Sequence, residues 1–275
     1  GGKSNTDFID NAGGVDCSDH EVNIKILLNE VVANGDMTVK QRNALLRKMT
    51  GEVGTLVLQN NYKQAQSISV AHSHARQSID EYIRLINRLE GDGKLDRDLE
   101  FIPADDLLQK RKAQQLGLTR PELSVLISYA KAELKESLSS TWITDDAYLS
   151  REIVTAFPQR LVKEFPAEID QHRLRREIIA TQIANDMVNT MGITFVEQLC
   201  QSSGADLAEV SAAYVIARDV FDVAGLWRDI EALDNQVDSA LQQQMMADLL
   251  RLVRRAVYWF LRNRQPDMTV ADTVA

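Results

Sequence analysis

Apolar residues recur every three or four positions through most of the chain, which is the spacing that places them on one face of an α-helix. Such stripes run through residues 20–33, 75–90, 119–139 and 235–262. The clearest consists of Leu123, Leu126, Ile127, Ala130, Leu134 and Leu138. No segment alternates apolar and polar residues over a useful length, so the pattern predicts a mainly all-α, multi-helix, bundle-like fold.

Capping residues and helix breakers predict where these helices begin and end. The string Thr119-Arg-Pro-Glu122 has the cap, early proline and capping-box glutamate of a helix start. Asp36 or Thr38 is expected to begin a helix that carries Met49, and a separate helix is expected over about 52–73. Residues 91–104 are irregular and acidic, which predicts a boundary between an N-terminal part, 1–104, and a helical C-terminal domain, 105–275.

The stretch before the first stripe is rich in groups that could hold a ligand. Gly13 and Gly14 are adjacent, and glycine lets the backbone turn or approach a ligand closely. Ser18, with Glu21 three residues later, forms a capping-box pattern. We therefore expect a polar glycine loop that leads into a helix beginning at Ser18, where free amides favour anionic groups.

The same residues carry a family resemblance. The string Asn11-Ala-Gly-Gly-Val-Asp-Cys-Ser18 resembles the Asn-Ala-Gly-Gly-Val-x-x-Ser signature of glutamate dehydrogenases. Over residues 5–25 the chain resembles the large NAD-specific glutamate dehydrogenases of bacteria more closely still, and the strings at 70–75 and 117–124 also fit. The resemblance covers nearly the whole chain and is most specific at residues 5–28.

The resemblance implies roles for four residues. Ser18 matches the serine whose hydroxyl binds the side-chain carboxylate of glutamate, and Asn11 matches the asparagine beside the nicotinamide and its ribose. Gly13 and Gly14 would give a cofactor access to the backbone. Each has a plainer interpretation, because Ser18 also fits a helix N-cap, Asn11 a turn asparagine and the glycines an ordinary turn.

The resemblance also implies that essential parts lie elsewhere. No Gly-x-Gly-x-x-Gly turn for NAD is present, and the family's catalytic lysine and aspartate precede the signature. We therefore expect the C-terminal piece of an enzyme that oxidises L-glutamate to 2-oxoglutarate and ammonium, inactive alone and with no catalytic residue. NAD would be bound mainly by an upstream α/β domain, of which an extended segment at 5–10 is the remnant. The upstream region and a homo-oligomer are the expected partners.

Composition and charge limit which partners and which cellular compartment are expected. The net charge of −9 argues against nucleic acid and anionic membranes as partners. No run of about 18 apolar residues suggests a membrane span. Cys17 and Cys200 are too few and too far apart in sequence for a disulfide framework, which favours a cytoplasmic protein.

Other clusters of reactive residues have ordinary explanations. Asp16, Asp19, His20 and Glu21 match no metal-ligand spacing, and acidic residues suit a helix N-terminus, so no metal site is expected. His72 and His74 would point to different sides of a helix. Cys17 adjoins the proposed site, but nothing in the sequence marks it as reactive. One helix carries a basic stretch, which we expect on its solvated or partner-facing side; nucleotide binding is the alternative. The stretch consists of Arg251, Arg254, Arg255, Arg262 and Arg264.

Two other function classes remain open at this level. The many capped helices and the absent cofactor motif would also suit a non-catalytic helical oligomerisation or interaction module. A metal-dependent hydrolase built on Asp16, Asp19 and His20 would instead require stoichiometric metal.

Overall fold

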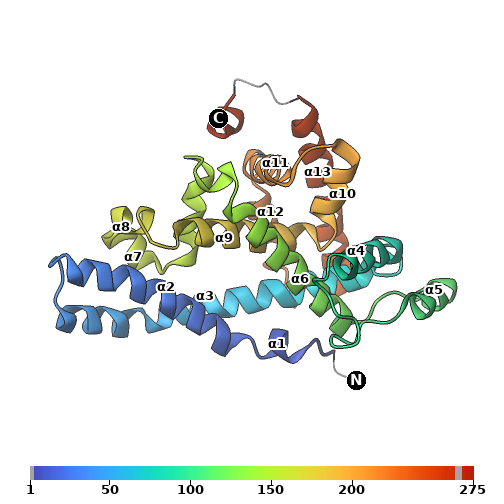
Figure 1. Cartoon of the computed structure of the whole chain (residues 1–275), viewed down its shortest axis with the longest axis horizontal. Helices are drawn as coiled ribbons and strands as arrows, with labels where there is room; N and C mark the ends of the chain where they lie inside the picture. Colours follow the sequence, from blue (N-terminus) through green and yellow to red (C-terminus); the bar gives the residue numbers. More distant parts are fainter. Residues whose placement is uncertain (1–2, 264–267) are drawn as a thin grey trace.

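The computed structural model describes residues 3–263 and 268–275, and within these ranges it contains helices and no strand (Figure 1). The prediction of a mainly all-α fold is confirmed. The longer helices are α2 (Gly13–Ala33), α3 (Val39–His74), α4 (Ile79–Gly91), α6 (Arg120–Ser139), α9 (Arg175–Met191), α11 (Leu207–Val220) and α13 (Ser239–Asn263). The shorter ones are α1 (Asp7–Asp10), α5 (Asp105–Ala113), η1 (Trp142–Thr144), η2 (Leu149–Ala156), α7 (Gln159–Glu164), α8 (Pro166–Asp170), α10 (Phe195–Ser203), α12 (Val223–Glu231) and α14 (Val270–Val274).

A long hairpin of α2 and α3 runs along one side of the molecule (Figure 1). The expectation of separate helices before and after residue 50 is wrong, because α3 continues through Gly51 and Gly54. Each interior glycine costs a helix about 1 kcal/mol. Burial of Leu45, Met49 and Ile68 along α3 offsets that cost.

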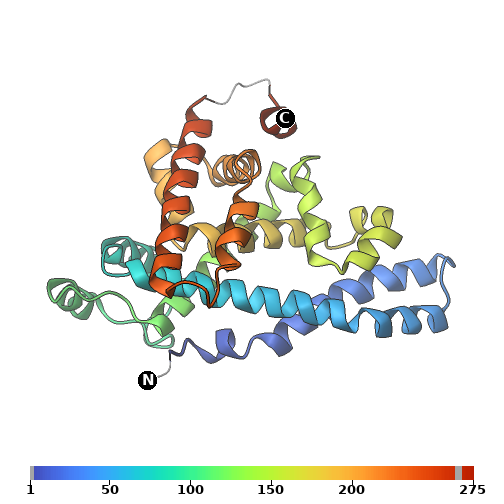
Figure 2. The same cartoon turned by 180° about the vertical axis from the view of Figure 1, so that it is seen from behind.

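The centre of the fold is built from α6 and α9, which pack closely against each other. The clean apolar stripe of α6 is buried here, and η2 covers another side of α9. Helices α11 and α13 pack together, with α11 on the opposite side of this centre from the α2–α3 hairpin, and one end of α13 reaches α3 (Figure 2). The start of α6 is fixed as predicted, since the amide of Thr119 donates to the carboxylate of Glu122 at 2.7 Å.

A buried ion-pair network joins η2, α9 and α11. The guanidinium of Arg218 donates to Glu152 at 2.6 Å, Asp186 at 2.9 Å and Asp219 at 2.9 Å. Tyr214 donates to the same Asp186 carboxylate at 3.0 Å. Burial by itself would lower the pKa of Arg218, but the surrounding carboxylates outweigh it and raise that pKa. The carboxylates therefore keep the Arg218 guanidinium charged inside the fold.

Residues 92–104 form the irregular connection that the sequence predicted. Arg97 holds it together by donating to the carbonyl of Pro103 at 3.1 Å and to Asp105 at 2.9 Å. Buried residues from both sides of this connection belong to one hydrophobic core, and the division at residue 104 stays a prediction. Among the described helices, none combines the length and the apolar character needed to cross a membrane.

Candidate functional site on the signature helix

The glycine motif lies at the junction of α1 and α2, with Asn11 and Ala12 between the two helices. The expected extended segment at 5–10 is only partly found. Thr6 is extended, with φ −93° and ψ 162°, but Asp7–Asp10 form the helical turn α1. Asn5 closes this turn by donating from its backbone and side-chain nitrogens to the carboxylate of Asp10 at 2.8 and 2.6 Å.

Ser18 does not begin a helix, so the predicted capping box is wrong. Helix α2 starts at Gly13, and the amide of Asp16 already donates to the carbonyl of Ala12 at 3.0 Å. Ser18 therefore lies inside α2, and its hydroxyl donates to the carbonyl of Gly14 at 3.1 Å. The expected partner Glu21 instead forms an ion pair with a lysine one turn later in the helix. The free amides of the helix N-terminus consequently lie near the glycines.

The two glycines have different surroundings. Both lie in the first turn of α2, and neither has the positive φ expected of a glycine turn. A Cβ on Gly13 would lie 3.8 Å from Val57 of α3, whereas a Cβ on Gly14 would meet nothing within 4 Å. Gly13 thus faces the hairpin partner, and Gly14 leaves open space beside the helix N-terminus. Ala12, the residue at the N-cap, has no side-chain hydrogen bond to these amides.

Consecutive asparagines on α3 anchor the motif. Asn61 donates to the carbonyl of Ile9 at 2.8 Å, and Asn60 donates to the carboxylate of Asp16 at 3.0 Å. Ile9 is itself almost fully buried. Because these contacts tie both α1 and the first turn of α2 to α3, they fix which side of the motif faces outward.

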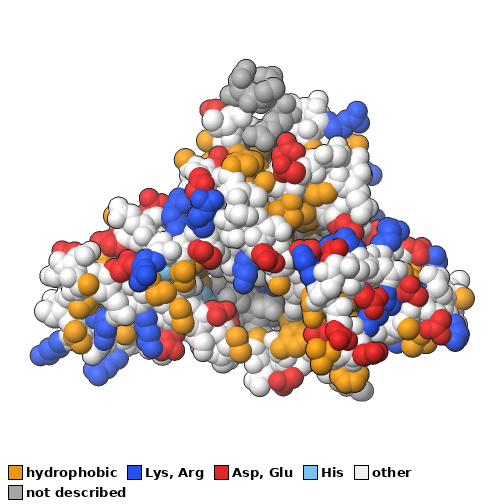
Figure 3. Space-filling view, in the orientation of Figure 1, with side chains coloured by type: hydrophobic (Ala, Val, Ile, Leu, Met, Phe, Trp, Pro, Cys, Tyr) orange, Lys and Arg blue, Asp and Glu red, His pale blue; other side chains and the backbone are white. Residues whose placement is uncertain are grey.

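The outward side carries the residues that the resemblance singled out. Asn11, Gly14 and Ser18 are exposed. Within the described residues the side-chain amide of Asn11 makes no hydrogen bond, whereas its backbone amide donates to the carbonyl of Asp7 at 2.7 Å. Two valines flank Ser18 on the same helix, with Val15 70% and Val22 51% exposed. Hydrophobic side chains also gather over α1 in the space-filling view (Figure 3). This face therefore combines polar groups with apolar surface that water solvates poorly.

The inward side of α2 carries a separate charged cluster. His20 is buried, its Nδ1 donates to the carbonyl of Ala156 at 3.0 Å, and its Nε2 lies 4.0 Å from Asp16. Burial lowers the pKa of Lys131, on α6, to about 7, with the carboxylate of Asp16 acting in the opposite direction. This lysine makes no ion pair with a described carboxylate. Across residues 3–263 and 268–275, no group of His, Cys, Asp or Glu is arranged to hold a metal ion.

Comparison with known proteins places this motif in a family. Residues 115–275 match the family model described as "Glutamate dehydrogenase, C-terminal", which covers more than half of the chain. The chain belongs to this family. Residues 1–71 match a second model, "Bacterial NAD-glutamate dehydrogenase, catalytic domain". The glycine motif thus lies in the catalytic-domain match, and the helices from α6 onward lie in the C-terminal glutamate dehydrogenase match.

Curated relatives are similar to this glutamate dehydrogenase region along its whole length. It is 59% identical over 275 residues to an NAD-specific glutamate dehydrogenase of Pseudomonas aeruginosa and 53% identical over 274 residues to one of Halomonas elongata. Identity to the protein of that name from Mycobacterium tuberculosis is 36% over 274 residues. The alignments cover 100% of the chain but only 17% of each relative. The chain therefore corresponds to a part of these enzymes.

Lys131 is the charged residue of this glutamate dehydrogenase region that the sequence analysis missed. It lies four residues after Ile127 and three before Leu134, so it occupies the apolar stripe of α6. A lysine at such a position was the available signal, because one turn of a helix returns a side chain to the same face. Its carboxylate neighbour, Asp16, comes from a helix more than a hundred residues away and could not be assigned from spacing.

The remaining candidates of the sequence analysis are scattered. Cys17 is exposed, and His72 and His74 lie at the end of α3, where burial, Arg120 and Lys3 lower the pKa of His72. Of the predicted basic stretch, Arg251, Arg254, Arg255 and Arg262 lie on α13. Arg264 lies outside the described residues.

Proposed function

We propose that this chain forms one wall of the active site in an NAD-dependent glutamate dehydrogenase. The complete enzyme would convert L-glutamate and NAD to 2-oxoglutarate, ammonium and NADH. The observation that carries the proposal is the outward face of α1 and α2, where Asn11, Gly14 and Ser18 are exposed together within the family's signature. The opposite face of α2 is packed against the fold, so this is the face open to the upstream region and to substrate.

Ser18 would bind the side-chain carboxylate of glutamate. A hydroxyl has one proton to donate, and the Ser18 hydroxyl now gives it to the carbonyl of Gly14 one turn earlier. A carboxylate is a stronger acceptor than a carbonyl, so rotation about the side-chain bond would redirect that proton to substrate. The exposed methyl groups of Val15 and Val22 would cover the methylene carbons of glutamate.

The surroundings of Asn11 and Gly14 suit the nicotinamide end of NAD. The side-chain amide of Asn11 is free to donate and accept, which fits a carboxamide or ribose hydroxyl. The N-terminus of α2 has no side-chain cap, and Gly14 leaves space beside its free amides. When bound, NAD supplies the hydride acceptor for the α-carbon of glutamate. Residues of this chain would orient the two reactants, whereas most NAD contacts and the catalytic lysine and aspartate would come from upstream.

The test is glutamate-dependent NAD reduction by the full-length protein and its Ser18→Ala variant. Loss of one charge-assisted hydrogen bond should raise KM for glutamate about tenfold to a hundredfold. A binding group acts on ground state and transition state alike, so kcat should change little. Thr55→Ala is the matched control, because the exposed Thr55 hydroxyl also donates to a carbonyl one turn earlier, at 3.1 Å. An unchanged KM in Ser18→Ala would remove this residue from the site.

Residues 1–275 alone should show no glutamate oxidation. The described part includes no strand, and therefore no strand–turn–helix unit for a dinucleotide. Measurable turnover by the isolated chain would contradict the assignment of catalysis to the upstream region.

A second role is bracing or oligomerisation through the helical region. Apolar side chains around α5 support it, since Leu99 is 72%, Phe101 88% and Leu116 52% exposed. Exposure of this kind marks surfaces that other protein covers. Light scattering on the full-length protein tests this role with the Phe101→Ser variant, which should lower the assembly state. Retained assembly together with unchanged thermal stability would count against a contact at Phe101.

A further inference from the structure

The inward side of α2 is held by the C-terminal part of the chain through two buried histidines. His20, on α2, donates from Nδ1 to the carbonyl of Ala156, at the end of η2, at 3.0 Å. His172, between α8 and α9, donates from Nε2 to the carbonyl of Asn23 of α2, also at 3.0 Å. The two histidines are 6% and 3% exposed. Both bonds therefore join α2 to the segment 156–172 where water is excluded.

The ring of His172 is fixed in one tautomer and one orientation. Its Nδ1 accepts from the backbone amide of Leu174 at 3.0 Å, so the ring proton lies on Nε2 and points at α2. Phe157 packs against the ring, with ring centroids 5.6 Å apart. An interior carbonyl of a helix already accepts from an amide one turn later, and its second lone pair is left for such a donor. His172 is therefore a preset donor aimed at the backbone of α2.

These contacts join the two parts of the chain that match different family models. His20 and Asn23 lie in the part that matches the catalytic-domain model, whereas Ala156 and His172 lie in the part that matches the C-terminal model. Helix α8 also packs beside α2 (Figure 1). The C-terminal helices thus hold the back of the helix whose front carries the signature.

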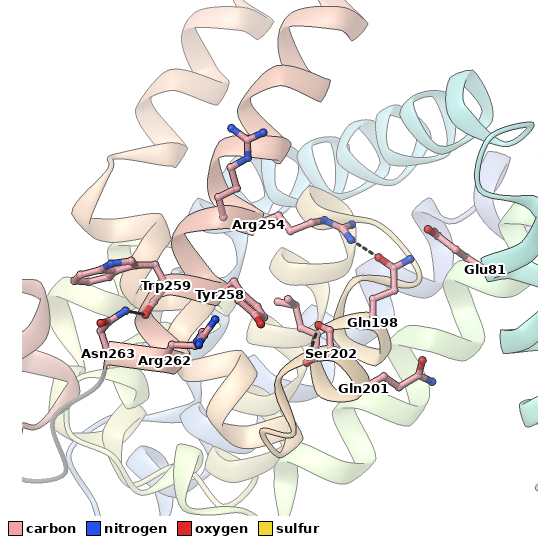
Figure 4. A pocket seen from close by; sticks show the side chains of 11 residues that line it. Glu81, Gln198, Gln201, Ser202, Arg254, Tyr258, Trp259, Arg262 and Asn263 are labelled. Carbon is pink, nitrogen blue, oxygen red and sulfur yellow. Dashed lines mark hydrogen bonds between the residues drawn. The ribbon is translucent and has the colours of Figure 1, made fainter.

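Another feature of the C-terminal helices lies away from α2. A hollow of about 1040 Å³ lies between α10 and α13, where Arg254 and Tyr258 are opposite Gln198 and Ser202 (Figure 4). The residues that line it come from α4, α10 and α13. This hollow therefore does not reach the signature helix, whereas the segment around His172 does.

Ser18 lies between two anchored positions of α2. Asp16, two residues earlier, is held by Asn60 of α3 at 3.0 Å, and His20, two residues later, is held by Ala156. At 3.6 residues per turn, positions two apart point about 200° from each other, so Ser18 faces outward when both neighbours face inward. A helix turns as a unit. The direction of the Ser18 hydroxyl therefore depends on contacts made on the opposite side of α2.

We propose that His20 and His172 are positioning residues for the glutamate site, because they set the rotation of the signature helix and with it the direction of Ser18. The inference rests on the proposed function of Ser18 as the group that binds the side-chain carboxylate. It gives the C-terminal helical region a part in substrate binding without any contact to substrate. A displacement of about 1 Å in a binding group loses much of a hydrogen bond, so loss of either histidine contact should weaken glutamate binding.

The test measures KM and kcat for glutamate in the full-length protein after each ring nitrogen is replaced separately. His172→Gln keeps an N–H donor near the place of Nε2, whereas His172→Asn keeps an acceptor near the place of Nδ1. His172→Asn should therefore raise KM about tenfold and His172→Gln about threefold or less, with kcat little changed. In the same way His20→Asn, which keeps a donor near Nδ1, should disturb KM less than His20→Leu.

Two further variants separate positioning from stability. Tyr214→Phe removes another buried hydrogen bond, from α11 to Asp186 of α9 at 3.0 Å, and should leave KM for glutamate unchanged. His172→Asn combined with Ser18→Ala should raise KM no further than Ser18→Ala alone, because the histidine acts through the serine. Additive effects in this double variant would overturn the proposal. An equal rise of KM in His172→Gln and His172→Asn, or in Tyr214→Phe, would also overturn it.

The outcomes also distinguish this inference from the function on which it rests. If Ser18→Ala raises KM and the His172 variants do not, the positioning role fails and the glutamate site stands. If Ser18→Ala leaves KM unchanged, the proposed function fails. Hydrogen exchange of the amides of residues 13–24 then tests the histidine contacts by themselves. Faster exchange in His172→Asn than in His172→Gln would support their hold on α2, and equal exchange would refute it.

Discussion

The half-buried lysine behind the signature helix allows a sharp test of the electrostatics. Lys131 lies in the apolar stripe of α6, and burial lowers its pKa to about 7. Asp16, the nearby carboxylate, is already engaged by Asn60 and only partly offsets the cost of burying the charge. Replacement of Lys131 by methionine keeps a long flexible side chain and removes the titrating group.

The size and sign of the effect follow from the pKa difference. An unfolded lysine has a pKa of about 10.4, so the folded state lowers it by roughly 3 units, or about 4 kcal/mol at 1.36 kcal/mol per unit. Because the folded pKa is the lower one, the folded chain binds fewer protons between about pH 7 and about pH 10.4. The wild-type chain is therefore destabilised by the full amount below about pH 7. Its free energy of unfolding rises as the pH increases from about 7 to about 10.4.

Urea unfolding followed by circular dichroism measures the penalty. The quantity to follow is the free energy of unfolding of Lys131→Met minus that of the wild type. This difference should be about 4 kcal/mol larger near pH 6 than near pH 10.5. Taking the difference between the two proteins cancels other groups that titrate at high pH. Lys135→Met on the exposed side of α6 is the control and should show little pH dependence. A difference for Lys131→Met that stays constant with pH would refute the reasoning.

Two further substitutions test packing. Arg218→Met should lower the free energy of unfolding by about 3–5 kcal/mol, because Glu152 and Asp186 would lose the cation that pairs with them, while Arg151 would remain only at Asp219 and, 4.0 Å away, at Glu152. A loss below about 1 kcal/mol in thermal denaturation would contradict this. Gly117→Ala should lower the free energy of unfolding by about 1–3 kcal/mol, because the new Cβ would lie 2.5 Å from the backbone of Ala75, just after α3. The Cβ of Gly14→Ala would have no atom within 4 Å, so this substitution should change the free energy of unfolding by less than about 1 kcal/mol. Equal effects of the two alanines in urea unfolding would exclude the steric explanation.

The helical class and several helix starts could be predicted from the sequence because they depend on local chemistry. The apolar period of residues 123–138 places its side chains on one face whatever surrounds the helix. The capping pair Thr119 and Glu122 acts within one turn and is found as expected. The irregular segment before α5 was equally readable, since it lacks any apolar period.

Local patterns failed where distant contacts outweighed them. Ser18 and Glu21 have the spacing of a helix start, yet α2 begins at Gly13. There Asn60 of α3 anchors the first turn of α2, and Asn61 anchors the preceding α1. In the same way, packing against the core carries α3 through Gly51 and Gly54, although the sequence predicted one helix carrying Met49 and a separate helix over about 52–73. A difference of about 1 kcal/mol in local preference is easily reversed by tertiary burial.

The sequence by itself therefore determined the helical class, the position of the family signature and the residues to examine in it. Only the tertiary structure decided that Asn11 and Ser18 face outward while Asp16 and His20 face the core, because that choice depends on which side of α2 packs against α3. It also brought Lys131 to Asp16 and gathered the arginines of α13 opposite α10. Such neighbours are set by how helices pack, which spacing along one chain does not encode.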